Sequence, residues 1–252
     1  MSRLKAAIDK TIKSKTPVGV IKEGNLNIVV MNSNDNRLNP TFCAHLHEAM
    51  DEVEQQEDVR GQVLVTVSTH PKIFSNGVDI EKLHTKDQVL ETLSGLNRFL
   101  LRMLKSRIPT IGCVNGHAFA GGWFLAMAHH YRIMNADRGW ICLNEIDLNV
   151  PIPKAFNAFG VQKLGEHNYC EASCIGYRYA AQEAFQKGIA TQIYPDKDVL
   201  AMTEDFADSL SAKNLDPVAF QLMSEDIYKT AIENLENPQN IDLTAEKIAE
   251  YK

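Results

Sequence analysis

The stretch IPTIGCVNGHAFAGGWFLAMAHHYRIM, residues 108–134, carries the clearest structural pattern in the chain. Its first part, TIGCV (110–114), is a short apolar run of the kind that is buried in a parallel sheet. A glycine-containing turn follows, and the small and apolar residues from about position 120 predict a buried helix. YRIM (131–134) then predicts another strand. Strand, turn, helix and strand in this order predict an α/β fold.

The alternation of strand and helix continues on both sides of this stretch. VLVTV (63–67) is another continuous apolar, β-branched run, and apolar side chains recur every three or four residues between Val89 and Leu104. Asn39-Pro40 is typical of a helix start, and Glu23-Gly24 is typical of the turn between two strands. We therefore expect strands over 17–22, 25–31, 63–67 and 139–142, and helices over 39–56 and 89–104.

The pattern becomes helical after Pro153. We expect helices over 155–164, 168–176, 180–187, 197–212, 215–235 and 243–251. Alternating strands and helices followed by a helical tail predict an α/β core, residues 1–195, with a C-terminal helical segment, residues 196–252. We expect the hinge between them at Ser211–Asn214.

The composition excludes several classes of protein. The 252 residues are 44% hydrophobic and 23% charged, which excludes a disordered chain and a fibrous repeat. A total of 26 Lys and Arg against 32 Asp and Glu gives a net charge of −6, which argues against a nucleic-acid partner. No apolar run is long enough for a membrane span. The first residues lack a secretory apolar segment, although their basic character through Lys15 weakly resembles a transit peptide.

The five cysteines favour a reduced, intracellular protein. Their number is odd and no CxxC pair occurs, which argues against a disulfide framework. Cys170 and Cys174 are one helical turn apart, and we expect both to be buried. Cys43, His45 and His47 are metal-binding residue types, but alternate residues of a helix point in opposite directions and cannot converge on one ion. We therefore expect no metal site.

Two familiar phosphate-binding motifs are absent. Residues 116–121 have the glycine spacing of a phosphate-binding loop, but Gly122-Trp123 stand where Lys and Ser or Thr are required. No G-x-G-x-x-G occurs, so nothing supports a bound dinucleotide. The sequence also lacks the G-x-S-x-G of a serine nucleophile elbow.

Two glycine-containing loops, each after a buried strand, are the best candidates for a binding site. The first is IFSNGVDI (73–80), and the second is NGHAFAGG (115–122). Glycine lets the backbone bend sharply and lets its N–H groups approach a ligand. If a helix starts near Gly121, its first amides also carry partial positive charge. Each loop alone is weak evidence, because such loops are more often simple turns.

One glutamate stands among large apolar residues in the segment WICLNEIDL (140–148). A carboxylate that is removed from water in such surroundings has a raised pKa and becomes a competent base near neutral pH. A solvated glutamate at the end of a strand is the alternative interpretation of Glu145 from the residues alone.

The three segments together resemble the enoyl-CoA hydratase/isomerase (crotonase) superfamily. The matching strings are VLVTVSTHPKIFSNGVDIEKL, IPTIGCVNGHAFAGGWFLAMAHHYRIM and LNEIDLNVPIP, and the resemblance covers about residues 17–195. FSNG, DRG (137–139) and LNEIDL look most like Δ3,Δ2-enoyl-CoA isomerases. The resemblance implies a crotonase-type spiral of ββα units with C-terminal helices for oligomerisation, an acyl-CoA thioester as substrate, and a homotrimer or a hexamer.

The resemblance also implies roles for residues of the two loops and for the glutamate. The backbone N–H groups of Val78 and Gly121 would form an oxyanion hole for the thioester oxygen, and Glu145 would be the catalytic acid/base. The neighbouring loop residues are expected to contact the substrate: Ser75, Asn76, Gly77, Asp79, Ile80 and Gly122.

One departure from the family pattern favours a particular reaction. Hydratases of the family use two glutamates, of which the second matches Glu145, whereas the first falls at Phe124 or Leu125. Neither can hold or activate water, whereas moving a double bond requires only one base. We therefore expect conversion of 3-enoyl-CoA to trans-2-enoyl-CoA in unsaturated fatty-acid oxidation, with no metal or redox cofactor, coenzyme A being part of the substrate. Asn149 replaces a glycine of many relatives, and Trp123-Phe124 is bulky beside the expected pocket.

Other reactions and another role fit the same residues. Dienoyl-CoA isomerisation and acyl-CoA hydrolysis also use a single glutamate in this superfamily, and a non-catalytic scaffold subunit would retain the fold without turnover. The resemblance places the protein in the mitochondrial matrix or peroxisome of a eukaryote, or in the cytoplasm of a bacterium.

Overall fold

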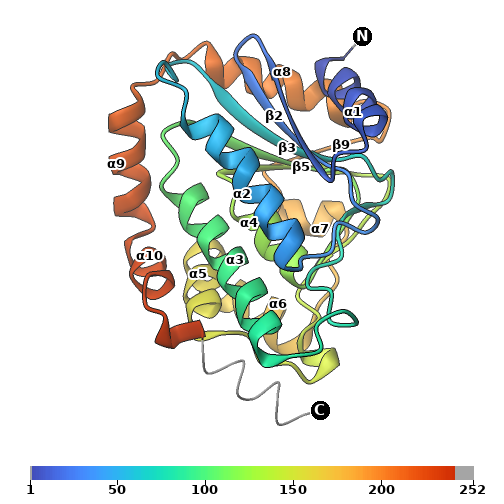
Figure 1. Ribbon diagram of the computed structural model, residues 1–252, viewed down its shortest axis with the longest axis vertical. Helices are drawn as coiled ribbons and strands as arrows, with labels where there is room; N and C mark the ends of the chain where they lie inside the picture. Colours follow the sequence, from blue (N-terminus) through green and yellow to red (C-terminus); the bar gives the residue numbers. More distant parts are fainter. Residues whose placement is uncertain (1, 242–252) are drawn as a thin grey trace.

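The larger of two sheets organises the computed structural model, which describes residues 2–241. Within the described residues it has six strands, in the order β1-β2-β3-β5-β7-β9 (Figure 1). β1 and β2 form the expected antiparallel hairpin, and all other neighbours are parallel. The strands are β1 (Val18–Glu23), β2 (Leu26–Met31), β3 (Val63–Ser68), β5 (Thr110–Val114), β7 (Tyr131–Asn135) and β9 (Gln192–Tyr194).

A smaller parallel sheet carries the segments that the sequence analysis identified as loops. It contains β4 (Ile73–Ser75), β6 (His117–Phe119) and β8 (Ile141–Cys142), in that order. The chain therefore runs β3-β4-α3, then β5-β6-α4, then β7-β8-α5, with one strand of each unit in each sheet. The predicted spiral of ββα units is confirmed. Each unit delivers the residues after its second strand to the same edge of the small sheet.

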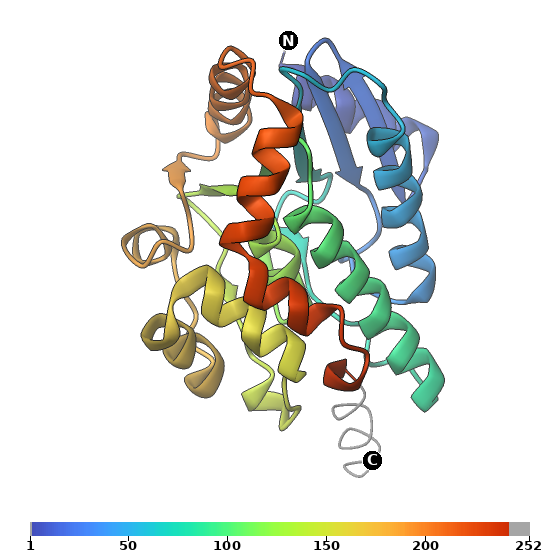
Figure 2. The ribbon, with the colours of Figure 1, turned by 90° about the vertical axis from the view of Figure 1, so that its left-hand side faces the viewer.

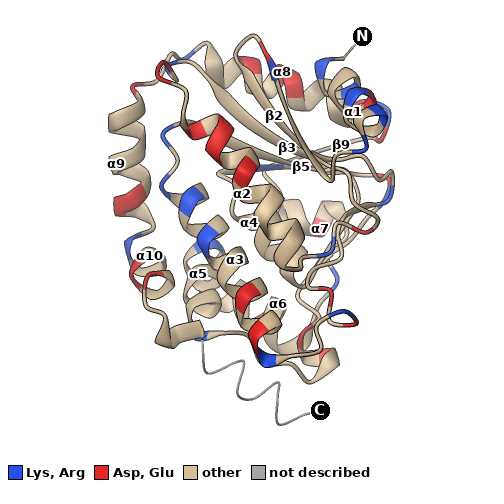
Figure 3. Ribbon diagram, viewed as in Figure 1, with Lys and Arg blue, Asp and Glu red and all other residues tan. Residues whose placement is uncertain are grey.

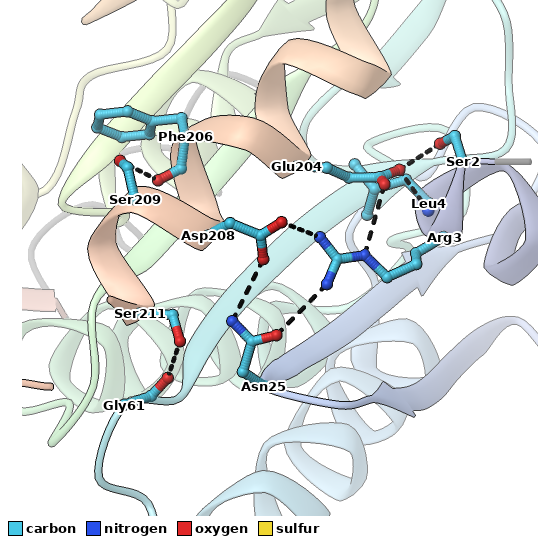
Figure 4. Close-up of polar contacts among 10 residues, drawn as sticks. All are labelled: Ser2, Arg3, Leu4, Asn25, Gly61, Glu204, Phe206, Asp208, Ser209 and Ser211. Atoms are coloured by element: carbon cyan, nitrogen blue, oxygen red, sulfur yellow. Dashed lines mark hydrogen bonds and ion pairs between the residues drawn. The ribbon is translucent and has the colours of Figure 1, made fainter. Parts of the chain in front are cut away.

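Two helices far apart in the sequence cover one face of the large sheet. α1 (Arg3–Ser14), where the sequence analysis predicted no element, buries Leu4 and Ile8 against it, and α8 (Val199–Ser211) lies beside α1. Figure 4 shows the polar contacts that join them: the Arg3 guanidinium contacts Asp208 at 2.6 Å, and the Leu4 N–H donates to Glu204 at 2.9 Å. The beginning and the end of the chain thus stabilise each other.

The other face carries most of the remaining helices. They are α2 (Pro40–Glu54), α3 (Lys86–Leu104), α4 (Gly121–Met127), α5 (Lys154–Leu164), α6 (Glu166–Ile175) and α7 (Ala181–Gln186). Asn39 caps α2 as expected, and Thr85 and Gln88 form a capping box at α3. Acidic residues of α2 face basic residues of α3 (Figure 3), where Arg102 contacts Asp51 at 2.7 Å.

The prediction of a single helix over 215–235 is wrong, because this segment forms two helices. α9 (Pro217–Ile227) and α10 (Lys229–Leu235) are separate, and α10 lies against α3 and α5 (Figure 2). The side-chain amide of Gln162 occupies the break, because it donates to the Ile227 carbonyl and accepts the Ala231 N–H. The helix predicted over 243–251 lies outside the described residues.

The predicted boundary at residue 196 falls just before α8. α8 contacts β3, β5 and β7, so its residues belong to the core around the large sheet. The chain leaves the sheet after α8, near the predicted hinge at Ser211–Asn214. An oligomerisation role for residues 196–252 stays a prediction.

All five cysteines are free, as the sequence predicts. Cys170 and Cys174, however, are exposed, so the prediction of their burial is wrong. They share one face of α6, and it is the opposite face, with Tyr169 and Ala172, that packs against the core. Over residues 2–241, none of the helices is sufficiently long and apolar to cross a membrane.

Candidate active site

A largely apolar cavity of about 450 Å³ lies where the two glycine loops meet the segment after β8. Val78, Gly121 and Glu145 all line it, so the structure brings together the three residues predicted to act on the substrate. Asn76 and Ile80 line it as well. Buried apolar side chains form one wall: Leu83, Val89, Leu93, Leu96, Phe124 and Phe156.

The first loop is held by side-chain and backbone hydrogen bonds. The Ser75 hydroxyl donates to the Asn36 carbonyl at 2.7 Å and accepts the Gly77 N–H at 3.2 Å. Gly77 has φ +73°, a left-handed conformation that glycine adopts at little cost. Asp79 is buried and pairs with Lys82 at 3.2 Å. The loop backbone is therefore fixed before any ligand arrives.

The amide of Val78 is left without a partner by this arrangement. The Leu38 N–H donates to the Gly77 carbonyl at 2.7 Å, and the Asp79 N–H donates to the Leu38 carbonyl at 2.8 Å. Successive amides of an extended chain point to opposite sides, so the intervening Val78 N–H points away from Leu38. Within residues 2–241 it donates to no backbone or side-chain acceptor. It is available to a ligand.

The second loop presents a matching amide. Ala120 has φ +51° and ψ −122°, a conformation that costs a non-glycine residue roughly 1–3 kcal/mol. Its N–H donates to the Cys142 carbonyl at 3.0 Å, and its carbonyl accepts the Trp123 N–H at 2.9 Å. α4 begins at the next residue, as predicted, and the Gly121 N–H has no acceptor among the described residues.

The two loops touch through their glycines. A Cβ atom on Gly77 would lie 2.6 Å from the Phe119 carbonyl oxygen and 2.7 Å from the Gly121 nitrogen. A Cβ atom on Gly121 would lie 3.3 Å from the Val78 nitrogen. On Gly122, it would lie 2.2 Å from the Ser75 carbonyl oxygen. Only glycines allow this approach, and it sets two unpartnered N–H donors close together at the cavity.

Glu145 precedes a short 3-10 helix, η1 (Ile146–Leu148). Its Oε2 atom is buried and has no hydrogen-bond partner among the described residues. Removal from water raises the pKa of the carboxyl to about 7, and a hydrogen bond from its own backbone only partly opposes this. The burial of Oε2 favours a desolvated carboxyl over the alternative of a solvated glutamate. A carboxylate of this kind is poised to exchange protons near neutral pH.

No second carboxylate stands opposite Glu145 in the cavity lining. Phe124 occupies the wall, with its ring centroid 5.0 Å from that of Phe156, whereas Leu125 is buried away from the cavity. Trp123 is also buried outside the lining, where its ring centroid lies 5.9 Å from that of Tyr169. The bulk of Trp123 therefore does not close the pocket.

Asn149 adopts a left-handed backbone conformation of the kind that favours glycine. Its φ is +54° and its ψ is 32°, which is the left-handed region. Asparagine tolerates this region better than other non-glycine residues. The departure from the family pattern is therefore compatible with the same turn after η1.

The predicted substrate-binding residues divide into two groups. Asn76 and Ile80 line the cavity, whereas Ser75, Gly77, Asp79 and Gly122 are absent from its lining and hold the loops in place. The sequence analysis missed three polar lining residues: Arg37, His117 and Asn144. Of these, Asn144 stands beside Glu145 in the sequence, and its Oδ1 atom is buried without a partner.

The described residues contain no group of three or more His, Cys, Asp or Glu side chains that could hold a metal ion. For proton transfer, the cavity offers one carboxyl group of raised pKa and two backbone donors, beside the polar residues Arg37, His117 and Asn144. Such a set can move a proton on a substrate whose developing negative charge rests on an oxygen at the two amides.

Comparison with known proteins points to one family. The chain is 28% identical over 239 residues to "Enoyl-CoA delta isomerase 3" of Arabidopsis thaliana, covering 91% of this chain and 97% of the relative. It is 28% identical over 192 residues to the mitochondrial "Enoyl-CoA delta isomerase 1" of Rattus norvegicus, covering 74% of this chain and 66% of the relative.

Solved structures share the fold. The crystal structure of human mitochondrial delta3-delta2-enoyl-CoA isomerase matches with a TM-score of 0.77 and 20% identity, covering 94% of this chain and 100% of that one. The enoyl-CoA hydratase EchA3 of Mycobacterium ulcerans matches with a TM-score of 0.80 and 22% identity, with the same coverage. The family model for enoyl-CoA hydratase/isomerase matches residues 21–250. The chain therefore belongs to the enoyl-CoA hydratase/isomerase family.

Proposed function

We propose that the protein is a Δ3,Δ2-enoyl-CoA isomerase, which moves the double bond of a 3-enoyl-CoA to give the trans-2-enoyl-CoA. The observation that carries this proposal is a cavity with one buried carboxyl, Glu145, beside two free amides and with no second carboxylate among its lining residues. The names of the isomerase relatives support the same reaction.

The reaction needs a base that removes a proton from C2, donors that stabilise the negative charge on the thioester oxygen, and an acid that returns the proton to C4. The Val78 and Gly121 N–H groups bind the thioester oxygen, which acidifies the C2 hydrogens. Ionised Glu145 takes a proton from C2, the C3–C4 double bond shifts to C2–C3, and the same carboxyl returns the proton to C4. The dienolate between the two steps carries its charge on the oxygen at the amides. No electron is gained or lost, so the scheme uses no redox cofactor, and coenzyme A is part of the substrate.

The order of magnitude of each contribution follows from general chemistry. General acid–base catalysis contributes roughly 10²–10⁴ in rate, and one oxyanion donor about 10²–10³. The carboxyl and the two amides therefore contribute comparably. An open cavity at Glu145 favours turnover over a scaffold role, because a scaffold needs no access to a buried carboxyl.

The raised pKa of Glu145 predicts a pH profile. The ionised form is the base, so kcat/KM should be level above pH 7 and fall about tenfold per unit below it, since burial raises the pKa to about 7. An ordinary glutamate would place this fall near pH 4.5 instead. Initial rates between pH 5.5 and pH 8.5, with folding followed by circular dichroism, measure it. A profile that is flat to pH 5.5 would contradict the assignment.

Failure to hydrate is the second expected property. Because Glu145 is the one carboxylate among the cavity-lining residues, water has no second carboxylate to hold it, so crotonyl-CoA should be recovered unchanged. Chromatography of the thioesters after incubation separates 2-enoyl-CoA from 3-hydroxyacyl-CoA. Efficient formation of the 3-hydroxyacyl product would show that the protein is a hydratase and not an isomerase.

A further inference from the structure

His117 lies at the cavity but takes no part in the proposed proton transfer. It is the first residue of β6, where it pairs with Ile73 of β4, and it is one of the residues that line the cavity. Its backbone is fixed, because the His117 N–H donates to the Lys72 carbonyl at 2.8 Å. The remaining question is what its imidazole does there.

The neighbours of the imidazole determine which nitrogen carries the proton. The backbone N–H of Trp140 donates to Nδ1 of His117 at 3.1 Å, so Nδ1 is an acceptor and the proton of the neutral ring is on Nε2. Partial burial lowers the pKa of His117, which keeps the ring neutral at physiological pH. The rings of Trp140 and Phe119 flank it, with centroids at 5.4 Å and 5.2 Å. The imidazole is therefore held as a neutral donor.

The Nε2–H group has no acceptor in the protein. Among residues 2–241, no hydrogen bond to Nε2 of His117 occurs, although the other ring nitrogen is satisfied. A half-buried N–H held at the edge of a cavity can be satisfied by a carbonyl oxygen of the ligand that fills the cavity.

The distance between His117 and the oxyanion donors indicates which carbonyl group of the substrate can accept this hydrogen bond. An extended strand advances about 3.3 Å per residue, so His117 lies on the order of 10 Å from the Gly121 amide. Consider an extended pantetheine arm whose thioester oxygen lies at the Gly121 amide. Its first amide carbonyl is closer to Gly121 than His117 is, whereas its second amide carbonyl is about as far from Gly121 as His117 is. This step rests on the proposed function, because it assumes a CoA thioester at the two amides.

From the place of His117 in the cavity lining and its unpartnered Nε2, we propose that the Nε2–H donates to the second amide carbonyl of the pantetheine arm, and that this hydrogen bond helps the protein to select CoA thioesters over shorter thioesters. His117 is a binding residue in this scheme. It neither donates to nor accepts from the reacting carbons.

A comparison of two substrates tests the assignment. A 3-enoyl-CoA carries both amides, whereas the 3-enoyl thioester of N-acetylcysteamine carries only the first. In His117→Asn the side-chain oxygen can still accept the Trp140 N–H, but no donor reaches as far as Nε2. The preference in kcat/KM for the CoA substrate should narrow by about three- to tenfold, the value of one neutral hydrogen bond. His117→Gln, whose amide donor reaches further, should retain most of the preference.

The outcomes separate this assignment from the proposed function. An equal loss of kcat/KM on both substrates would show that His117 acts on the loop or on the chemistry. An unchanged preference for the CoA substrate would show that His117 does not bind the pantetheine arm. Either result overturns the assignment. If the wild-type protein turns over neither thioester, the proposed function fails, and calorimetry with free CoA still decides the role of His117. The Asn variant should bind CoA about three- to tenfold more weakly than the wild type, and equal affinity would overturn the assignment.

Discussion

Glu145→Gln should lower the isomerisation rate by a factor on the order of 10²–10⁴. Glutamine has the shape of glutamate and can fill the same buried position, but its amide cannot accept a proton from C2. No other carboxylate is among the cavity-lining residues, so none can take its place. The measurement is kcat with a 3-enoyl-CoA, followed by the absorbance of the 2-enoyl thioester.

The Glu145→Gln substitution should not lower the free energy of unfolding at pH 8. The folded protein raises the pKa of Glu145 from 4.5 to about 7, so it binds this proton more tightly than the unfolded chain does. The stability that this proton contributes is lost as the pH rises from 4.5 to 7, and above pH 7 the ionised buried carboxylate is a cost to folding. At pH 8 the variant should be at least as stable as the wild type in urea.

A neighbouring carboxylate provides the matched control. Asp147 lies two residues further along, is exposed, and is outside the cavity lining. Asp147→Asn removes the same charge from the same segment and should leave the rate near the wild-type value. Near-native turnover by Glu145→Gln, or an equal loss in both variants, would contradict the role of Glu145.

Gly77→Ala should lower kcat by about 10²–10³ through the oxyanion hole. The added Cβ would lie 2.6 Å from the Phe119 carbonyl oxygen and 2.7 Å from the Gly121 nitrogen, both of which are backbone atoms. The two loops must therefore separate, which moves the Val78 and Gly121 donors apart while Glu145 remains in place. Binding of the thioester oxygen in the charged intermediate should weaken more than binding of the CoA moiety.

Gly188→Ala isolates the effect of backbone strain. Gly188 has the same φ of +73° as Gly77, but a Cβ atom there would have nothing within 4 Å. Both variants should lose about 1–2 kcal/mol of folding stability from the left-handed alanine. Only Gly77→Ala should lose catalysis. Equal rates in the two variants would show that the contact between the loops is unimportant for the reaction.

The sequence predicts the sheet and the two loops because local patterns carry that information. Apolar β-branched runs such as VLVTV identified the strands, and glycines at 77 and 121–122 identified the bends. What these patterns cannot show is which amides remain free. Leu38, forty residues away, binds the Gly77 carbonyl and the Asp79 N–H on either side of Val78. The Gly121 amide is directed by the strained conformation of Ala120, which has no sequence signature.

Other elements depend on contacts that no local pattern contains. α1 is a helix on the sheet because α8, two hundred residues later, supplies Glu204 and Asp208 for its first turn. The break between α9 and α10 depends on Gln162 of α5. The exposure of Cys170 and Cys174 depends on which face of α6 meets the core. Helical periodicity identifies a face but does not tell which neighbour covers it.

The central claim is that this cavity shifts a double bond with the protein's own groups. The most direct measurement is incubation of the purified protein with a 3-enoyl-CoA, without any added cofactor, while the absorbance of the conjugated 2-enoyl thioester is recorded. We expect a protein-dependent, saturable rise in this absorbance, with 2-enoyl-CoA as the accumulating product. No rise above the protein-free rate, or release of free CoA in place of the 2-enoyl thioester, would contradict it.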